Sequence, residues 1–282
     1  MPVPELPEVE VLTRYLRPLL DGRRIRGVTI YRDKTIRPNR RADLELALKG
    51  ARFHSLNRRG KYLVFSLRKA RKSFDLLGHL GMTGRMYLAE RGGTLPKHAA
   101  VVLDLDKGRF VFEDTRYFGR ITLDLSSLAR LGPEPLGDAF TPDYFHEVLQ
   151  SSGQAIKVKL LDQSFVAGVG NIYASEALYR ARLAPTRPAR RLNHRQASRL
   201  RDCIREVLAE AIEFGSTVPL SWNAPGDSLF YYGRAPESPD YYTEKLAVYD
   251  RESQPCLKCG AKIRRIVQAS RSTYYCPHCQ GS

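Results

Sequence analysis

Two short cysteine motifs, CLKC at residues 256–259 and CPHC at residues 276–279, decide the fold of the last part of the chain. Each motif can place two thiolates on one tetrahedral metal ion, and the 16 residues between the motifs are typical of a zinc ribbon. A redox-active dithiol would need only one such motif. We therefore expect one structural zinc ion, with four protein ligands and no open position for water: Cys256, Cys259, Cys276 and Cys279.

The segment around these cysteines is basic, and so is the whole chain. From residue 256 to the end there are five Lys or Arg residues and no Asp or Glu. The 282 residues carry a net charge of +16, with 46 Lys and Arg against 30 Asp and Glu. Basic side chains bind phosphates and release their condensed counterions, so the composition favours nucleic acid as the partner.

Several classes of protein are disfavoured by the same composition. A hydrophobic content of 43% is enough for a packed core and argues against disorder. The sequence has no apolar run of the roughly 18 residues that a membrane helix needs. Residues 1–10 carry three acids and three prolines and do not resemble a signal peptide. We expect a cytoplasmic protein in which the cysteines stay reduced.

Working toward the N-terminus, the pattern before the cysteines is helical. A long segment from residue 215 to 242 is rich in Gly, Pro, Ser, Asp and aromatic residues and is expected to be a functional loop. Residues 132–137 (GPEPLG) form a Pro- and Gly-rich break, which we interpret as a linker. Apolar residues at helical spacing predict four helices between these two segments, over residues 142–151, 156–162, 172–182 and 195–214.

The N-terminal half has a different pattern. Val9, Leu12, Leu16 and Leu19 recur at helical spacing and predict a helix over residues 5–20. Short runs of β-branched and aromatic residues follow, separated by turns, and indicate a β-sandwich or barrel. The predicted strands cover residues 25–31, 52–57, 62–67, 74–80, 99–105, 109–112 and 120–123.

The start of the first helix, residues 4–10 (PELPEVE), resembles the opening of the formamidopyrimidine-DNA glycosylases, of the superfamily that also holds endonuclease VIII. The resemblance implies that Pro4 is a nucleophile with a free amine and that Glu5 is the general acid. A free α-amine has a pKa of about 8, against about 10.4 for lysine, so more of it is unprotonated near neutral pH. Such an amine can attack C1′ of a sugar and form an iminium (Schiff base).

The sequence departs from the family at this position, because residues 1–3 precede Pro4. An internal proline nitrogen is part of a tertiary amide and cannot be a nucleophile. Our hypothesis is that translation starts at Val3, read as Met from a GTG codon and then removed. The alternatives are trimming by a peptidase or the loss of lyase activity.

Further motifs in the N-terminal half match the family in order. Lys61, in the turn NRRGKY at residues 57–62, would orient the sugar-phosphate. The resemblance makes HLGMTG at residues 79–84 and DTRYFG at residues 114–119 the loops that fill the void left by a flipped base. Their expected DNA contacts are the apolar wedges Met82 and Phe118 and the partner-base contact Arg116, together with His98, which matches a phosphate-contacting histidine segment.

Matching motifs in the C-terminal half are expected to contact phosphates. The sequence GVGNIY at residues 168–173 opens a helix and resembles the family's helix-two-turn-helix motif. The expected DNA contacts are Lys157, Asn171 and Tyr249. Arg271, at the tip of the finger, would hold the phosphate beside the flipped nucleotide. We therefore group Arg271 with the expected catalytic residues Pro4, Glu5 and Lys61.

The resemblance spans residues 4–280 and implies an α+β fold: an N-terminal β-sandwich opened by a helix, a helix-two-turn-helix domain and a four-cysteine zinc ribbon. We expect domain boundaries at residues 1–135, 136–245 and 246–282. The implied function is a monomeric glycosylase and abasic-site lyase that removes 8-oxoguanine and formamidopyrimidines from damaged duplex DNA by β,δ-elimination.

Two alternatives stay open. The loop at residues 216–242 lacks Lys and Arg until Arg234, whereas the family is basic near the start of this region. This departure leaves room for an endonuclease-VIII-like enzyme that removes oxidised pyrimidines. Retention of residues 1–3 would instead favour a non-catalytic zinc protein that binds damaged DNA.

Overall fold

The computed structural model describes residues 4–217 and 246–281. They form two compact units, of which the first runs to Ala129 and the second begins at Arg130. The predicted linker, residues 132–137, lies inside the second unit. The N–H of Gly132 donates to the carbonyl of Gln163 at 2.9 Å, and a Cβ at this position would lie 2.5 Å from the carbonyl oxygen of Ser164. This segment is therefore packed rather than a free connection.

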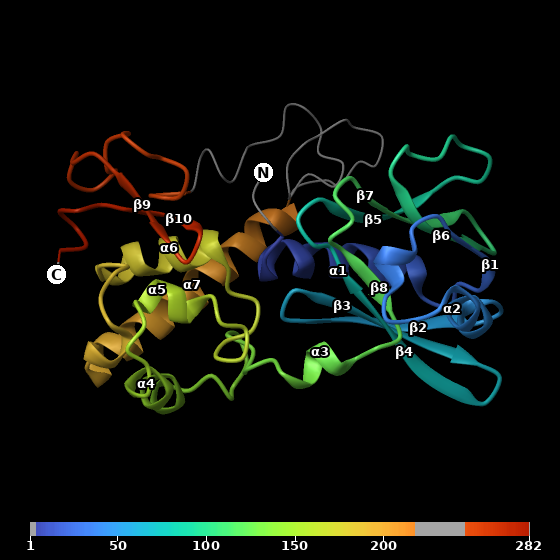
Figure 1. Cartoon of the computed structure of the whole chain (residues 1–282), viewed down its shortest axis with the longest axis horizontal. Helices are drawn as coiled ribbons and strands as arrows, with labels where there is room; N and C mark the ends of the chain where they lie inside the picture. The colour runs from blue at the N-terminus through green and yellow to red at the C-terminus, as the bar shows by residue number, and fades with distance from the viewer. Residues whose placement is uncertain (1–3, 218–245, 282) are drawn as a thin grey trace. The chain divides into compact units, whose positions relative to one another are not determined.

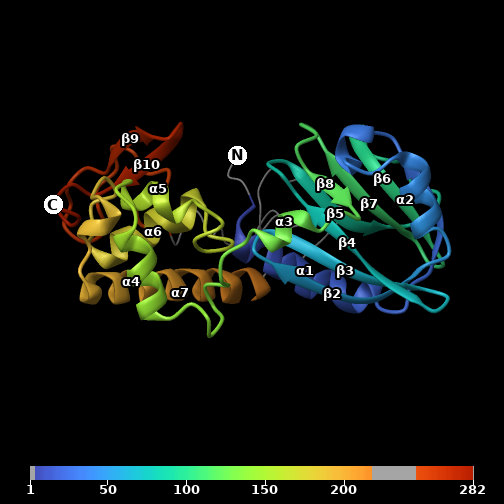
Figure 2. The same cartoon turned by 60° about the horizontal axis from the view of Figure 1, so that its bottom comes forward.

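The first unit is a β-sandwich of two four-stranded antiparallel sheets, as expected (Figure 2). One sheet has the strand order β1-β6-β7-β5 and the other has the order β2-β3-β4-β8. The strands are β1 (Ile25–Ile30), β2 (Arg52–Arg59), β3 (Tyr62–Lys69), β4 (Lys72–His79), β5 (Gly84–Ala89), β6 (Ala99–Leu105), β7 (Arg109–Asp114) and β8 (Arg120–Thr122). The helices are α1 (Leu6–Leu20), η1 (Asp33–Ile36), α2 (Arg41–Leu48) and α3 (Ser126–Ala129).

Buried apolar residues alternate with more exposed residues along the strands, and the buried ones form the core between the two sheets. In β3, Leu63, Phe65 and Leu67 are fully buried, while the residues between them are only partly buried. The ring of Phe65 lies 5.9 Å from that of Phe53 in its own sheet and 5.6 Å from that of Phe110 on the other sheet. Aromatic pairs at this separation add to the burial of apolar surface, so the trio joins the two layers.

Helix α1 forms as predicted and packs mainly against β2. Val9, Leu12, Leu16 and Leu20 lie on one face and are at most 1% exposed. Burying a leucine contributes roughly 1.5–3 kcal/mol, so this stripe fixes the helix firmly to the sandwich. The position of the first turn of α1 is consequently set by the core.

Four elements of the first unit were not predicted: the short helices η1 and α3, helix α2 and strand β5. The edge strand β5 follows the predicted loop at residues 79–84 directly. Helix α2 has only two buried residues, Leu44 and Leu48. Both β5 and α2 are short and carry a weak apolar pattern, which explains why periodicity alone did not reveal them.

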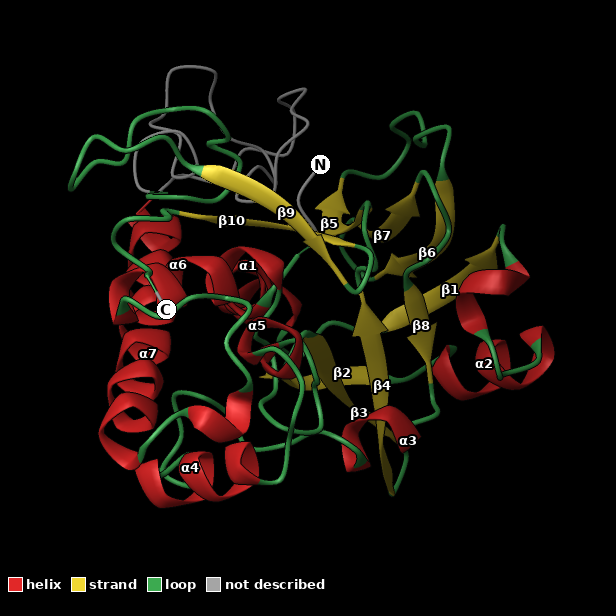
Figure 3. Cartoon of the chain, turned by 60° about the vertical axis from the view of Figure 1, so that its left-hand side comes forward, coloured by secondary structure: helices red, strands yellow, loops and turns green. Residues whose placement is uncertain are grey.

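The second unit holds the four predicted helices and a small hairpin (Figure 1). The elements are α4 (Pro142–Gln150), α5 (Ile156–Leu160), α6 (Asn171–Ala181), η2 (Ala189–Arg191), α7 (His194–Thr217), β9 (Arg264–Gln268) and β10 (Arg271–Tyr275). Strand β10 packs against α6 (Figure 3). None of the helices in the described part of the chain has the length and hydropathy to cross a membrane.

Candidate functional site

The N-terminal end of α1 holds the two residues expected to carry the chemistry. Pro4 is buried and directly precedes Glu5, which is the N-cap of the helix. The backbone N–H of Glu5 donates to Oε2 of Glu8 at 2.8 Å. Glu5 and Glu8 are only 2% and 1% exposed. A carboxyl group is thus held beside Pro4 in a defined and protected position.

An ion pair connects this part of α1 to the turn between β2 and β3. The guanidinium of Arg58 donates to Oε2 of Glu10 at 2.7 Å and to the carbonyl of Gly60 at 3.1 Å. Burial raises the pKa of Glu10, but the hydrogen bonds from Arg58 and Arg14 outweigh burial and leave that pKa below its usual value. Lys61 follows Gly60 directly, so the ionised Glu10 fixes the turn that carries Lys61 against α1.

His79, at the end of β4, lies beside this turn and was not given a role from the sequence. It pairs in register with Tyr62, and the two rings are 4.7 Å apart. Burial, with the positive charges of Lys61 and Arg120, lowers the pKa of His79 to about 4. Its Nδ1 accepts a hydrogen bond from the N–H of Gly81 at 3.1 Å. The ring is therefore neutral at pH 7 and carries its proton on Nε2.

The loops at residues 79–84 and 114–119 are organised by one buried carboxylate, Asp114. Asp114 is 0% exposed and accepts hydrogen bonds from the hydroxyl of Thr83 at 2.5 Å and the N–H of Gly119 at 2.7 Å. It also accepts one from the N–H of Arg116 at 3.1 Å. Both loops are attached to the same side chain, so their positions are set together.

Gly81 brings the two loops into direct backbone contact. Its φ is +65°, and an added Cβ would lie 2.5 Å from the nitrogen of Gly119. Any other residue would both strain this conformation and collide with the neighbouring backbone. The sequence motif HLGMTG therefore needs a glycine at its third position.

The tips of these loops present an apolar ring and a cation to solvent. Phe118 is 46% exposed, which is unusual for a phenylalanine. The guanidinium of Arg116 lies 5.1 Å from the centre of the Phe118 ring, and Nζ of Lys34 lies 5.0 Å from it. Met82, in the other loop, is partly buried. The arrangement suits side chains that enter a base stack from a cationic surface.

His98 lies at the base of the loop at residues 114–119. Its carbonyl accepts a hydrogen bond from the N–H of Asp114 at 3.0 Å, and its Nδ1 is 3.4 Å from the hydroxyl of Tyr117. The guanidinium of Arg32 lies 5.1 Å from the centre of the Tyr117 ring. His98 is thus placed on the same surface as the loop tips.

In the second unit, Lys157 joins three segments that are distant in sequence. Lys157 is 1% exposed, and its ammonium donates to Oδ1 of Asn171, the carbonyl of Ser272 and the hydroxyl of Thr273, at 2.5, 3.0 and 2.8 Å. The amide of Asn171 also donates to the carbonyl of Ser272 at 3.0 Å. The structure therefore brings Lys157 and Asn171 together, next to Arg271 at the start of β10.

Tyr249 is held by a second buried charged residue, Glu176 on α6. The Glu176 carboxyl group accepts hydrogen bonds from the backbone N–H groups of Ala247, Val248 and Tyr249, all at 2.8–2.9 Å. Burial raises the pKa of Glu176, although the three N–H donors oppose that shift. The Tyr249 ring packs 5.2 Å from that of Tyr274.

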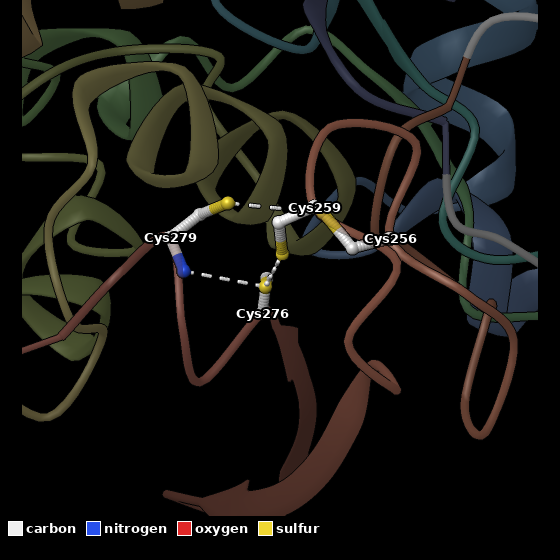
Figure 4. Close-up of side chains that lie close together, drawn as sticks. All are labelled: Cys256, Cys259, Cys276 and Cys279. Carbon is white, nitrogen blue, oxygen red and sulfur yellow. Dashed lines mark hydrogen bonds between the residues drawn. The ribbon is translucent and has the colours of Figure 1, made fainter.

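The four C-terminal cysteines form one cluster (Figure 4). Their sulfur atoms all lie within 4.8 Å of one another, with Cys259 and Cys276 at 3.5 Å and Cys256 and Cys279 at 3.9 Å. A disulfide needs about 2.05 Å, whereas four sulfurs at about 2.3 Å from one zinc lie roughly 3.8 Å apart. The backbone N–H groups of Lys258 and Cys279 point at sulfur atoms, which favours thiolates. The donor set and spacing fit one structural zinc ion.

Comparisons with known proteins agree with this geometry. Three sequence profiles match: the formamidopyrimidine-DNA glycosylase N-terminal domain at residues 3–121, the H2TH domain of the same glycosylase at residues 131–220, and the zinc finger found in FPG and IleRS at residues 253–281. The formamidopyrimidine-DNA glycosylase of Thermus thermophilus is 42% identical over 288 residues, with 99% of each chain covered. The chain belongs to the formamidopyrimidine-DNA glycosylase family.

Solved structures of the family have the same fold as this chain. The Lactococcus lactis Fpg in complex with DNA containing an abasic site has a TM-score of 0.86 and 31% identity, covering 99% of this chain and 100% of that one. MutM in complex with DNA containing carbocyclic 8-oxo-G has the same score, identity and coverage. These matches confirm the predicted family and fold, and they give no support to the two alternative functions.

The functional loop predicted up to residue 242 lies outside the described residues from position 218 onward. His79 is a residue of this site for which the sequence predicts no role, because it begins the motif HLGMTG and reads as part of the loop that follows. The signal available was its place at the end of a strand directly before a turn, and only the sheet register shows that it faces the Lys61 turn.

Proposed function

We propose that Pro4 is the nucleophile and Glu5 the general acid with which this chain excises damaged bases. As a member of its family, the chain is a DNA glycosylase and abasic-site lyase for oxidised purines. The observation that carries the residue assignment is the position of Pro4 and the buried Glu5 at the start of α1, with the Lys61 turn fixed to the same helix by Glu10 and Arg58.

In this mechanism the Pro4 nitrogen attacks C1′ of the flipped nucleotide, and the bond between C1′ and the base breaks. Glu5 donates its proton to the sugar ring oxygen as the ring opens, leaving an iminium between Pro4 and C1′. The iminium acidifies the C2′ hydrogens, so β-elimination breaks the C3′–O bond and δ-elimination the C5′–O bond. The Pro4 nitrogen can do this only as a secondary amine, which requires removal of residues 1–3.

The exposed tips of the first unit are proposed to hold the duplex open. Flipping a base costs a few kcal/mol, and an inserted apolar side chain offsets part of that cost. Phe118 and Met82 would occupy the vacated space, while Arg116 would hydrogen-bond the orphaned base. The cationic contacts of Arg116 and Lys34 with the Phe118 ring support this assignment, because they place positive charge where the phosphates would approach.

Phosphate contacts are proposed for Lys61, His98, Asn171, Tyr249 and Arg271. The buried position of Lys157 supports a different role for that residue: its ammonium positions Asn171 and the finger strand β10. The four thiolates need a reducing environment, which supports a cytoplasmic enzyme associated with the chromosome. One chain carries the complete set of residues assigned here, which supports a monomer.

Borohydride trapping tests the nucleophile. Borohydride reduces an iminium to a permanent bond between protein and DNA, so each form is incubated with duplex containing 8-oxoguanine. One form begins with Met directly before Pro4, and the other is the chain as written. Crosslinking of the shorter form alone supports Pro4 as the nucleophile. If both forms bind the duplex and neither crosslinks, the lyase assignment for this lesion is wrong.

Glu5→Gln tests the general acid. We expect excision under single-turnover conditions to slow by about 10²–10⁴-fold, the usual contribution of such a group. Binding to duplex with an abasic-site analogue should change little, because the substitution keeps the size of the side chain. Glu45→Gln, in α2, is the matched control. An excision rate within twofold of the unaltered protein would remove Glu5 from the mechanism.

A further inference from the structure

The hairpin of β2 and β3 is basic at both of its ends. Residues 49–72 contain nine Lys or Arg residues and no Asp or Glu. Three of the nine, Arg58, Arg59 and Lys61, belong to the turn already described. The other six lie at the opposite end of the sheet, where β2 begins and where β3 turns into β4: Lys49, Arg52, Arg68, Lys69, Arg71 and Lys72.

The sheet register places like charges directly opposite each other at this end. Arg52 pairs with Arg68, and Lys69 pairs with Lys72 across the turn to β4. Arg24 extends the row, because it forms an isolated bridge with Arg52. Like charges in directly opposed positions destabilise a sheet, so this row is unfavourable for the folded chain alone.

No ion pair between described residues neutralises the row. Arg52 donates to the carbonyl of Gly22 at 3.1 Å, and Lys69 donates to the carbonyl of Leu46 at 2.5 Å. The nearest carboxylates of the described chain form no ion pair with the row: Asp75 accepts the hydroxyl of Ser66 at 2.7 Å, and Asp106 accepts only from the backbone N–H of Arg24 among the residues of the row. By contrast, Arg58 at the other end of the hairpin has a carboxylate partner in Glu10.

The basic side chains also converge in space. A Cβ built on Gly50 would lie 3.9 Å from Cε of Lys69 and 4.0 Å from Nη2 of Arg24, so these two side chains approach each other over Gly50. Arg52, Arg68, Arg71 and Lys72 are all exposed. At the tip, Ala70 adopts a positive φ of 53°, an uncommon conformation for alanine, and the turn places Lys69 opposite Lys72.

The row is too far from the Lys61 turn to contact the same phosphates. Six residue steps separate Tyr62 from Arg68, which is about 20 Å of extended strand. The two basic ends therefore lie at opposite ends of the pair β2 and β3, whose strands Figure 1 shows side by side.

We propose that this basic rim, made of Arg24, Lys49, Arg52, Arg68, Arg71 and Lys72, binds the phosphate backbone of a second DNA segment. The inference rests on the proposed function only in taking DNA as the ligand of the chain. A polyanion removes the mutual repulsion of the row and releases counterions. An acidic protein fits less well, because a protein interface needs an apolar core and the large apolar side chain exposed beside the rim is the single residue Leu46.

Such a rim would let the enzyme take hold of a second duplex before leaving the first. The test preloads the whole protein on a short labelled duplex with an abasic-site analogue and follows its release as unlabelled duplex is added. We expect the release rate to rise with competitor concentration, because the second segment binds first. In Arg52→Gln/Arg68→Gln the release rate should become independent of competitor, and the salt slope of competitor binding should fall by about 0.9 per lost phosphate contact.

The matched control is Arg40→Gln/Arg41→Gln, which removes two charges from the same unit where both arginines already pair with aspartates. It should behave like the unaltered protein. Melting temperatures no lower than that of the unaltered protein, and equal affinity for the short duplex with the abasic-site analogue, show that neither pair of substitutions unfolds the chain.

Two results would overturn the proposal. One is a release rate that does not depend on competitor in the unaltered protein. The other is unchanged competitor dependence in the rim variant; if polyglutamate then binds the unaltered protein and not the variant, the rim serves an acidic protein. The assay follows binding alone, so its outcome is independent of whether Pro4 forms a crosslink.

Discussion

Asp114 in the first unit and Lys157 in the second are buried side chains of opposite charge, and each holds several chain segments together by hydrogen bonds. Each is at most 1% exposed, and each gathers segments that carry expected DNA contacts. Asp114 accepts from Thr83, Arg116 and Gly119, and the donors are two backbone N–H groups and a hydroxyl. Lys157 donates to Asn171, Ser272 and Thr273, and every acceptor is a neutral oxygen.

The segments bonded to Asp114 and those bonded to Lys157 differ in the size of the apolar core that supports them. The loops around Asp114 are continuous with strands of a sandwich that has a large apolar core. The segment around Ser272 belongs to a finger whose buried cluster is small and includes two of the cysteines. Asp114 therefore orders loops whose positions are already set by a large apolar core, whereas Lys157 attaches the helical part of its unit to a finger whose fold depends on the metal.

Removing the zinc should have the largest effect on this comparison. We expect Cys276→Ser to lose the metal and unfold the finger, because structural zinc contributes roughly 10–16 kcal/mol of apparent binding energy at pH 7. Zinc content and limited proteolysis of the finger measure the change. Cys203→Ser, a buried cysteine in α7 outside the cluster, is the control and should keep its zinc. A folded, zinc-free Cys276→Ser finger would contradict the expectation.

Asp114→Ala should have the next largest effect, about 4 kcal/mol of unfolding free energy, because buried donors lose their acceptor. Asp114→Asn keeps one oxygen and should cost about half as much. Urea unfolding measures both. Asp104→Ala removes a surface partner of Arg109 and should change stability by less than about 1 kcal/mol. Equal losses for Asp104→Ala and Asp114→Ala would show that Asp114 is not the organising residue.

Lys157→Met should cost about 3 kcal/mol, since Asn171, Ser272 and Thr273 lose a charged donor. The sharper measurement is the salt dependence of DNA affinity. A lysine that contacts a phosphate contributes about 0.9 to the slope, whereas a buried positioning lysine leaves the slope unchanged. Lys159→Met, two residues further along, removes an ion pair with Asp162 and serves as the control. A reduced slope in Lys157→Met would restore the phosphate contact expected from sequence.

The smallest effect is a dependence of stability on pH that comes from His79. Its folded pKa of about 4 lies below the ordinary value of 6.5. Between these values the unfolded chain binds a proton and the folded chain does not, so stability falls as pH drops from 6.5 toward 4. At pH 5 the loss is about 2 kcal/mol relative to pH 8. The melting temperature of His79→Gln should vary less with pH than that of the unaltered protein. His54→Gln, which replaces an exposed histidine, should keep the pH dependence of the unaltered protein.

The sequence predicted most of the elements that the structure contains. Helix α1 and seven of the strands were visible because their apolar residues recur with clear periods, and the zinc cluster was visible because its ligands are adjacent in the motif. Strand β5 was missed because an edge strand needs only one well-buried face. The Pro- and Gly-rich segment at residues 132–137 was interpreted as a linker from its composition, but its hydrogen bond to Gln163 inside the second unit depends on tertiary packing.

The roles of charged residues were much harder to predict. Lys157 lies in a short helix with a second lysine nearby, which is the usual pattern of an exposed helix face, and its burial follows only from its contact with the finger 115 residues later. Asp114 begins the loop motif DTRYFG, and nothing in that motif predicts that its carboxylate is buried and accepts hydrogen bonds from both loops. The register that brings Arg52 opposite Arg68 is likewise a property of strand pairing rather than of either segment alone.

The close approach of Gly81 to Gly119 couples the movement of the loop at residues 79–84 to that of the loop at residues 114–119. The backbones run so close that a Cβ on Gly81 would lie 2.5 Å from the nitrogen of Gly119, and both loops donate hydrogen bonds to Asp114, so we expect them to move together. In the proposed reaction, Met82 and Phe118 would therefore enter the duplex in a single movement, with Arg116 arriving at the orphaned base at the same moment. Interrogation of a base pair by this chain would then be an all-or-none event, with one energy barrier to insertion and no state in which only one wedge is in place.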